Sequence, residues 1–376
     1  MMFAKFFKAA ELRSSESDWS SFTEDFLLAT DRILSYDYTR RFTKVGSFTM
    51  VLPFDKTVLR RLKLNGTIYY DKDWLWIQSI EYNGETITLS GTDCKGFLDT
   101  RISLYNTDQQ QAQGTQGYDA VAGTTAECLE HYLLNNCIKQ YCSSGRELPL
   151  ISQISGTSGL SNDNYMSSLE LLSEIFANMC ENAEIGYDIK GVLRDKCFQV
   201  QLLSGIDRSH IQAERPRVIF SSRHRNIRSQ NYVHGVEDLF NAIYATDSNN
   251  YTSLVFRDGE GVSQLNRREC NVSVGIANTD SYFEKYALRE TADNLETHSF
   301  TVEAAVSSGY GEKYELGDYV SLLDDFTNNL QRVQITEATK SYASGQQSLS
   351  LVFGTPKQKP LQKIVNSFIS GTAKRR

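Results

Sequence analysis

The sequence contains little proline and no long apolar run. Only 5 of its 376 residues are proline, and no stretch approaches the ~20 apolar residues that a membrane-spanning helix needs. The apolar residues near the N-terminus are interrupted by Lys5, Lys8 and Glu11, and no small-residue cleavage site follows them. We therefore predict neither a signal peptide nor a membrane span.

Paired cysteines and an excess of cations are also missing. The 7 cysteines form no CxxC pair, and 39 Lys and Arg face 46 Asp and Glu, which gives a net charge of −7. Nucleic-acid binding needs clustered cations, so the balance argues against it as the overall task. We expect buried free thiols in a protein made in a reducing cytoplasm. The thiols on apolar positions are Cys128, Cys137, Cys142, Cys180 and Cys197.

The central pattern is a predicted hairpin from Trp74 to Asp93. Two strand-like runs flank Asn83-Gly84, a dipeptide that tolerates the positive φ required at both positions of a tight hairpin turn. The second run alternates, whereas the first is apolar on both sides, with Trp74, Trp76, Ile80 and Tyr82 on one face and Leu75 and Ile77 on the other. Such a strand is covered twice, by its own core and by another domain or subunit. Trp74 and Trp76 are therefore interface candidates.

Along the chain, strand patterns give way to helical ones and then return. We predict a mainly β fold with α insertions: two antiparallel β domains, a helical insertion domain and a C-terminal helix. The predicted segments are a β domain at 1–105, a helix-rich insertion at 106–214, a second β domain at 215–355 with a helix at 280–295, and a basic tail at 356–376. Each β domain has one helix, at 55–62 and 280–295, which suggests an internal duplication.

The insertion begins with a polar loop and carries two predicted capping boxes. Gln and Gly residues make 106–123 a flexible loop or a contact arm. Thr124 with Glu127 and Ser167 with Glu170 have the spacing in which a hydroxyl and a carboxylate cap the first helical amides. We therefore predict helices that start at these two positions.

We find no residues in the sequence with the spacing of a known catalytic or metal-binding motif. His131 lies near Cys128 on one helix but lacks a second ligand pair with suitable spacing, so we expect a hydrogen-bonded helical histidine. His210, His224, His234 and His298 are scattered. Turn chemistry accounts for the acidic pairs Asp71-Asp73 and Asp324-Asp325. We predict no enzymatic activity, no cofactor and no metal site.

Two basic segments are candidate interaction surfaces. The first contains Arg215, Arg217, Arg223, Arg225 and Arg228. It fits DNA or an acidic partner surface, or else a solvated or inter-subunit face that is paired with carboxylates; we favour the interface. The second is the C-terminal tail, whose apolar residues Leu361, Ile364, Val365 and Phe368 have helical spacing. This helix docks either on a partner protein or on its own domain.

The assembled layout resembles the tail-hub proteins of long-tailed bacteriophages. The stretches that carry the likeness are GSFTMVLPFD at 46–55, WLWIQSIEYNGETITLSGTDCKGFLDTR at 74–101, LLSEIFANMCENAEIGYDI at 171–189, GIDRSHIQAERPRVIFS at 205–221 and YELGDYVSLL at 314–323. The resemblance implies two domains similar to a tail tube, so that three copies form a pseudo-sixfold ring. Many relatives continue into a peptidoglycan-degrading region, whereas this chain stops soon after its last predicted strand.

We therefore expect a structural virion protein of the tail tip or baseplate, made in the host cytoplasm. The resemblance implies a homotrimer that contacts the distal tail protein or tail tube, the tape measure protein, and tip spike or fibre proteins. Genomic DNA would pass through its channel without sequence-specific binding, and the acidic charge would let it slide. The alternatives are a tail-associated peptidoglycan-degrading lysin and a host-surface-binding module.

Overall fold

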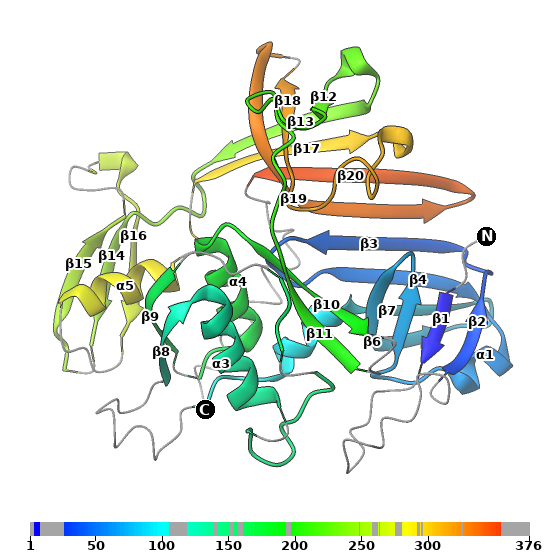
Figure 1. The fold of residues 1–376 in the computed structure, drawn as a ribbon, viewed down its shortest axis with the longest axis horizontal. Coiled ribbons are helices and arrows are strands. Elements are labelled where there is room, and N and C mark those ends of the chain that lie inside the picture. The colour runs from blue at the N-terminus through cyan, green and yellow to red at the C-terminus, as the bar shows by residue number, and fades with distance from the viewer. Residues whose placement is uncertain are drawn as a thin grey trace. The chain divides into compact units, whose positions relative to one another are not determined.

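The structure is a computed structural model of the chain (Figure 1). It describes residues 4–7, 26–104, 119–138, 141–150, 153–156, 161–167, 169–192, 197–247, 249–257, 262, 264–274, 280–291, 294, 296–324 and 326–354. The chain divides into two units, Met1–Gln230 with Val302–Leu351 and Asn231–Thr301 with Val352–Arg376. The segment boundaries predicted at residues 105, 214 and 355 stay predictions.

The first unit is built on a large, mainly antiparallel sheet with the strand order β20-β19-β3-β4-β7-β6-β5-β1-β2. β18 pairs with β19, and β12 pairs with β18 in parallel. The strands are β1 (Ala4–Phe7), β2 (Phe26–Thr30), β3 (Ser35–Arg41), β4 (Ser47–Pro53), β5 (Thr67–Tyr70), β6 (Asp73–Tyr82), β7 (Thr86–Asp93), β12 (Ile219–Phe220), β18 (Tyr319–Asp324), β19 (Asn329–Ala343) and β20 (Gln346–Gly354). The mainly β character predicted from the sequence is confirmed.

Local sequence signals placed the first strands and helix correctly. The predicted strand pair between Arg32 and Pro53 corresponds to β3 and β4, which pair antiparallel. Helix α1 (Lys56–Arg61) starts after Asp55, whose carboxylate accepts hydrogen bonds from the amides of Thr57 and Val58. These bonds satisfy amides that the helix itself leaves without partners.

The predicted hairpin is formed by β6 and β7, but its turn differs from the prediction. Neither Asn83 nor Gly84 has a positive φ. Asn83 instead precedes the turn, and its side-chain oxygen accepts hydrogen bonds from the amides of Glu85 and Thr86 at 2.9 and 2.8 Å. The asparagine therefore stabilises the turn through its side chain, as Asx turns do.

A β-bulge at Gln78 corrects the predicted faces of β6. Ile77 pairs with Gly91, but Ser79 pairs with Ser90, so Gln78 is an extra residue. The extra residue reverses the alternation. Ile80 therefore packs with Leu75 and Ile77 rather than with the tryptophans.

In the residues that the structure describes, the insertion contains two α-helices and two antiparallel strand pairs. Helix α3 (Thr125–Cys137) has the predicted capping box of Thr124 and Glu127, whereas α4 (Leu172–Asn182) starts at Leu172 without a side-chain cap. The second predicted capping box is wrong, because Ser167 belongs to strand β9, where its hydroxyl bonds that of Ser103 at 2.5 Å. β8 (Asp119–Thr124) pairs with β9 (Ser161–Ser167), and β10 (Gly186–Val192) pairs with β11 (Cys197–Leu203). None of the helices in the described ranges is long and apolar enough to cross a membrane.

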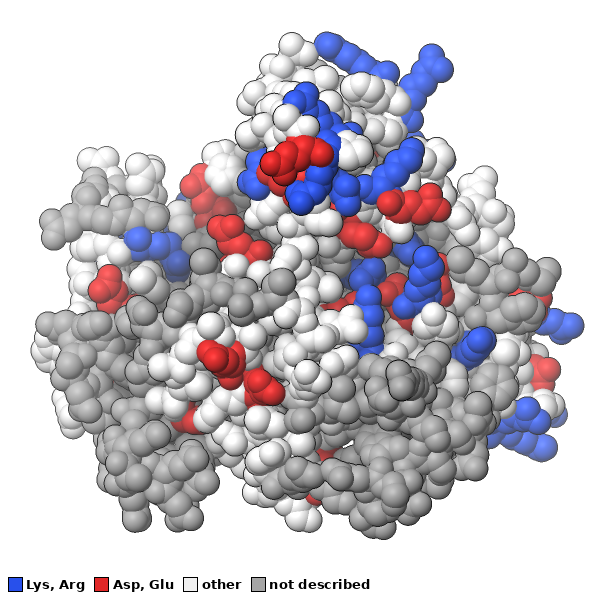
Figure 2. Space-filling model, in the orientation of Figure 1, with Lys and Arg blue, Asp and Glu red and all other residues white. Residues whose placement is uncertain are grey.

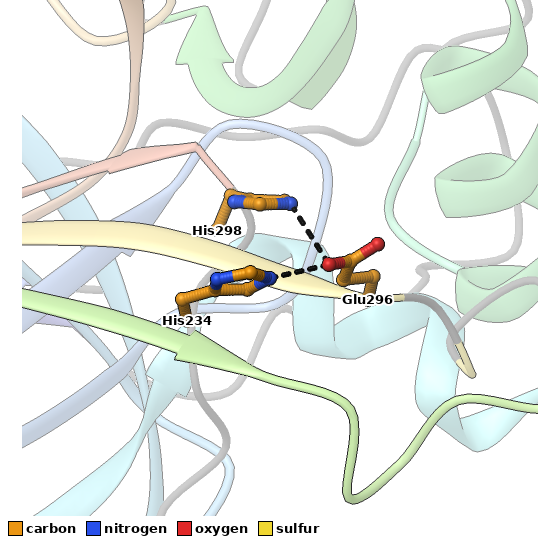
Figure 3. A group of neighbouring side chains, drawn as sticks. All are labelled: His234, Glu296 and His298. Carbon is orange, nitrogen blue, oxygen red and sulfur yellow. Dashed lines mark hydrogen bonds and ion pairs between the residues drawn. The ribbon is translucent and has the colours of Figure 1, made fainter. Parts of the chain in front are cut away.

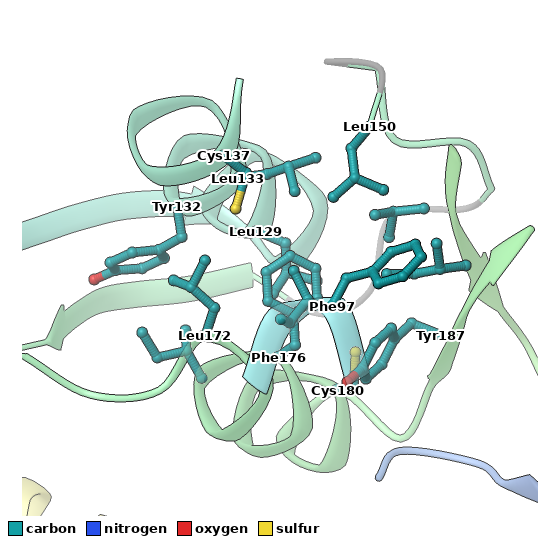
Figure 4. Packing of buried hydrophobic residues seen from close by; sticks show 14 of the residues in the cluster. Phe97, Leu129, Tyr132, Leu133, Cys137, Leu150, Leu172, Phe176, Cys180 and Tyr187 are labelled. Carbon is teal, nitrogen blue, oxygen red and sulfur yellow. The ribbon is translucent and has the colours of Figure 1, made fainter. Parts of the chain in front are cut away.

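The tryptophan face of β6 is covered by this insertion. Trp74 is only 5% exposed, and its ring meets the ring of Phe198 edge to face with centroids 5.4 Å apart. Phe97 meets the ring of Phe198 in the same way at 5.3 Å, and the ring of Trp76 packs on Phe97. The same core includes both helices, with Leu129, Tyr132, Leu133, Phe176 and Cys180 (Figure 4). The insertion, which belongs to the same unit, thus supplies the second cover that the sequence predicted for this strand.

The second unit has its own small sheet, with the order β15-β14-β16, which helix α5 covers. Its elements are β14 (Ala242–Thr246), β15 (Thr252–Phe256), β16 (Glu269–Ser273) and α5 (Asp280–Glu290). Phe283 and Ala287 of α5 pack on Ile243, Ala245 and Val255. Because α5 packs on this separate sheet and α1 contacts β2, the two helices do not support the predicted duplication.

Two strands, β13 (Ile227–Gly235) and β17 (Thr297–Ala304), lead from one unit into the other. Both segments are predicted as strands from the sequence. Between β12 and β13 lies a short 3₁₀ helix, Ser222–His224, and another 3₁₀ helix, Cys94–Thr100, follows β7.

The pairing of β3 with β19 joins the two regions that the sequence predicted as separate β domains. Seven residue pairs connect them, from Glu337 with Arg41 to Ala343 with Ser35. The threonines at the centre of this register, Thr39 and Thr339, also hydrogen-bond through their hydroxyls at 2.9 Å. Strands about 300 residues apart therefore lie in one sheet.

A buried charged junction centres on Arg40 of β3. Its guanidinium lies 3.6 Å from Asp73 of β6, 3.2 Å from Asp188 of β10 and 3.8 Å from Glu315. The side chains of Arg40, Asp73 and Asp188 are 13%, 8% and 12% exposed. One cation thus links the sheet, the insertion and the segment that leads into β18.

Lys95 extends the junction. It is 2% exposed, lies 3.7 Å from Asp93, and donates a hydrogen bond to the carbonyl of Arg41. Burial lowers the pKa of Lys95, and the carboxylates of Asp93 and Asp188 oppose that shift. Burying a charge is tolerated only where such partners compensate the lost hydration.

The pKa values of the two aspartates that contact Arg40 are shifted in opposite directions. Burial raises the pKa of Asp73 to about 6, and Arg40 offsets only part of this shift. Burial acts in the same direction on Asp188, but Arg40, Lys95 and Lys190 outweigh it and lower the pKa of Asp188. Asp188 therefore stays ionised in the mildly acidic range in which Asp73 takes up its proton.

The bulge predicts a strict requirement for glycine at position 91. A Cβ there would lie 2.0 Å from the carbonyl oxygen of Trp76. Gly91→Ala should therefore lower the free energy of unfolding by about 1–3 kcal/mol, the usual cost of overpacking, measured by urea unfolding. Gly84→Ala is the matched control, because a Cβ at Gly84 meets nothing within 4 Å. Equal stability of both variants would contradict the close approach of the two strands at the bulge.

The raised pKa of Asp73 predicts a pH-dependent difference between two variants. The folded-state pKa of about 6 exceeds the ordinary 3.8, so ionisation of Asp73 costs stability as the pH rises through this window. Asp73→Asn removes that cost, and its stability relative to wild type should rise by roughly 2 kcal/mol between about pH 4.5 and 7.5.

Asp188→Asn is the control for this experiment. The pKa of Asp188 is lowered, so its stabilising contribution is present above the ordinary value and is lost only at more acidic pH. The destabilisation by Asp188→Asn should therefore be nearly equal at both pH values. A pH-independent difference between Asp73→Asn and wild type would show that Asp73 titrates normally.

Candidate functional site

The strongest surface feature of the first unit is a group of arginines around β12. Arg215, Arg217, Arg223, Arg225 and Arg228 are all exposed; we call them the arginine surface. Figure 2 shows Lys and Arg side chains gathered over the region of β12 and β18, with acidic side chains among them. The sequence indicated this group because its members are close together in the chain, and their role in an interface stays a prediction.

Most of the arginine surface is not neutralised by the part of the chain that the structure describes. Arg228 forms an ion pair with Glu303 at 3.2 Å. Arg223 donates to the side-chain oxygen of Asn328, and Arg217 to the carbonyl of Gln212. Within the described ranges, no carboxylate pairs with Arg215, Arg217, Arg223 or Arg225.

Two nearby arginines that do not belong to the arginine surface form ion pairs within the chain. Arg208 lies 2.9 Å from Asp318, and Arg332 lies 2.9 Å from Asp207 while its guanidinium stacks on the ring of Tyr319 at 3.7 Å. These pairs hold the segment before β12 against β18 and β19. The arginine surface, in contrast, presents cations that can attract an anionic partner.

The other predicted interface residues are either buried within the chain or lie outside the described residues. Trp74 is buried inside the chain, and Trp76 is partly buried against the same core, so Trp74 is a residue of the intramolecular core. The tail residues Leu361, Ile364, Val365 and Phe368 lie outside the described residues. Of the polar loop predicted at 106–123, residues 106–118 also lie outside them, whereas residues 119–123 belong to strand β8, so the prediction is wrong there.

The residues considered for catalysis have structural partners. His131 bonds the carboxylate of Asp119 at 2.9 Å, as expected for a hydrogen-bonded helical histidine. Asp324 caps a turn through the amide of Phe326. Asp71 also lies in a turn, with a φ of 50°, but Asp73 belongs to the buried charged junction, so turn chemistry was the wrong explanation for it.

The cysteines that the structure describes are free, and four of them are buried. These four are Cys94, Cys128, Cys137 and Cys180. Burial raises the pKa of Cys137 and of Cys180 to about 12. Thiols of this kind stay protonated at neutral pH and are poor nucleophiles.

One cluster escaped the sequence analysis. The cluster lies on the surface of the second unit and consists of His234 of β13, Glu296 just before β17, and His298 of β17 (Figure 3). Their ligand atoms lie within 4.8 Å of one another. Glu296 and His298 are two residues apart where a strand is predicted to begin at Thr297, a spacing that places two side chains on one face of an extended segment. No pattern in the sequence indicated that β13 is the neighbouring strand.

Solved structures with a similar fold are known. The tail protein from Neisseria meningitidis MC58 matches over 94% of this chain and 96% of its own, with a TM-score of 0.53 and 12% identity. The 43 kDa tail protein of prophage MuSo2 from Shewanella oneidensis matches over 88% and 95%, with a TM-score of 0.51 and 10% identity. At these identities the likeness establishes the fold alone.

No curated protein matches the chain in sequence. The family model of the siphovirus ReqiPepy6 Gp37-like proteins, however, matches residues 26–257, more than half of the chain. This match confirms the resemblance to proteins of long-tailed phages that the sequence suggested. The chain therefore belongs to the family of siphovirus ReqiPepy6 Gp37-like proteins.

Proposed function

We propose that this protein is a structural hub of a phage tail tip or baseplate. In this role three copies form a ring around the channel through which the genome leaves. The observation that carries the proposal is the large antiparallel sheet, in a family of phage proteins and a fold found in two tail proteins. None of these comparisons names a catalytic activity.

The sheet is suited to a part that transmits force because it unites both ends of the described chain. β3 and β19 bring the N-terminal and C-terminal strand groups together, and Arg40 ties the insertion to them. Such a body resists deformation, since separating its segments would expose uncompensated buried charges. In the proposed ring, one side contacts the tail tube or distal tail protein, and the other contacts the tape measure and the spike or fibre proteins.

The arginine surface is the proposed contact between copies. The chain carries a net charge of −7, so its surface outside these arginines is acidic on average. A neighbouring copy therefore offers the carboxylates that Arg215, Arg217, Arg223 and Arg225 do not find within the described part of their own chain. Contacts of this kind accelerate association and set orientation.

A mass measurement tests the ring. Size-exclusion chromatography with light scattering should give a particle of three chains, each of 42.6 kDa, and averaging of electron micrographs should show threefold symmetry. A dimer, a tetramer or a monomer at every concentration tested would overturn the proposed trimer.

Charge reversal tests the contact. Arg217→Glu with Arg223→Glu should weaken the trimer about tenfold or more, which corresponds to ~1.4 kcal/mol, because carboxylates would then face carboxylates. Arg225 is left unchanged in this variant because its φ of 53° makes any substitution there harder to interpret. Sedimentation at several concentrations measures the dissociation.

Arg60→Glu with Lys63→Glu is the matched control, since both side chains are exposed on the same unit but away from the arginine surface. This control should leave the trimer intact, and all variants should melt at similar temperatures. If the Arg217 and Arg223 variant remains a trimer but loses binding to a DNA duplex at low salt, the arginine surface binds DNA instead of a second copy.

A further inference from the structure

The histidine cluster of the second unit has the arrangement of a metal site built on two strands. Residues two apart on an extended strand point to the same face, and this relation holds for Glu296, just before β17, and His298 within it. β13 lies next to β17 in the sheet and contributes His234. Three side chains that can ligate a metal thus come from one face of adjacent strands.

The ring nitrogens of both histidines point to the same carboxylate oxygen (Figure 3). Nε2 of His298 lies 3.4 Å from Oε1 of Glu296, and Nε2 of His234 forms a short contact with the same atom. The rings stack, with centroids 4.3 Å apart and an interplanar angle of 23°. Two ligands of a tetrahedral zinc ion with bonds of about 2.0–2.1 Å lie about 3.3 Å apart, so the spacing at His298 needs little adjustment.

A second group of residues orients His298. The hydroxyl of Tyr232 bonds Nδ1 of His298 at 3.0 Å, and the ring of Tyr232 stacks on Phe300 with centroids 4.4 Å apart. The backbone of His298 is held closely as well, because a Cβ on Gly354 would lie 2.3 Å from its carbonyl oxygen. When Nδ1 carries the proton and donates it to the Tyr232 oxygen, the lone pair of Nε2 is free to bind a metal, which is the usual support for a metal-binding histidine.

The cluster is open to solvent. The three side chains are 50%, 44% and 54% exposed for His234, Glu296 and His298, so water can reach the remaining coordination positions.

We propose that His234, Glu296 and His298 bind one divalent transition-metal ion, for which zinc is the reference. Two imidazoles and one carboxylate favour zinc, nickel, cobalt or copper over magnesium and calcium, which prefer oxygen ligands. The site leaves at least one position for water or for a ligand from another molecule, because three protein ligands do not complete a tetrahedron. This inference is independent of the proposed hub function.

Zinc titration of the full chain tests the site. After treatment with a chelator and in the presence of a reductant, calorimetry with zinc should show one ion bound per chain. His234→Gln with His298→Gln should abolish this binding, and Glu296→Gln should weaken it about tenfold or more. Tyr232→Phe should keep the stoichiometry and weaken binding by about tenfold, the lower end for loss of a supporting hydrogen bond.

His224→Gln is the matched control, because His224 is also exposed but lies outside the cluster. It should bind zinc as wild type does. Cobalt spectra should lack thiolate charge-transfer bands, which separates this site from the cysteines. Absence of zinc binding in the wild type, or equal binding in the double histidine variant with an unchanged melting temperature, would overturn the proposal.

Discussion

The structure of the first unit depends on placing one guanidinium, that of Arg40, among carboxylates from distant segments. Asp73, Asp188 and Glu315 lie on three different parts of the chain. A buried ion pair contributes little net stability, but a mispaired one costs several kcal/mol, on the order of 3–5. We infer that the junction selects one arrangement among the many that a large sheet of similar strands permits. The closely packed ring of Phe42 beside Gly186 and Gly317 adds steric selection at the same place.

Much of the fold could be predicted from local patterns. Strands with period-two alternation, the Asp55 cap and the capping box at Thr124 depend on residues within a few positions of one another. The errors were also local. At Gln78 a single extra residue reversed the faces of β6. At Ser167 a capping pattern occurred in a strand, because the tertiary partner of its hydroxyl outweighed the local propensity.

The sites were predicted less completely, because their members are distant in sequence. The arginine surface was found because five arginines lie within residues 215–228. Arg40 and Asp188 are 148 residues apart, and His234 and Glu296 are 62 apart. Only the strand order brings such residues together, and a single sequence contains no signal for strand order beyond adjacent hairpins. The His234 cluster and the charged junction therefore required the structure.

Because Trp74 is buried within the chain, its strand face is not available for a hydrophobic contact between copies. An apolar strand face left for a neighbouring subunit would have favoured a hydrophobic interface, but the insertion already covers this face. Of the predicted interface residues that the structure describes, the five of the arginine surface are exposed. Their cations repel one another, so in the proposed ring each copy would place them against an acidic surface of its neighbour. A contact between two different surfaces closes into a ring when the rotation between copies allows it, and the proposed hub requires this arrangement.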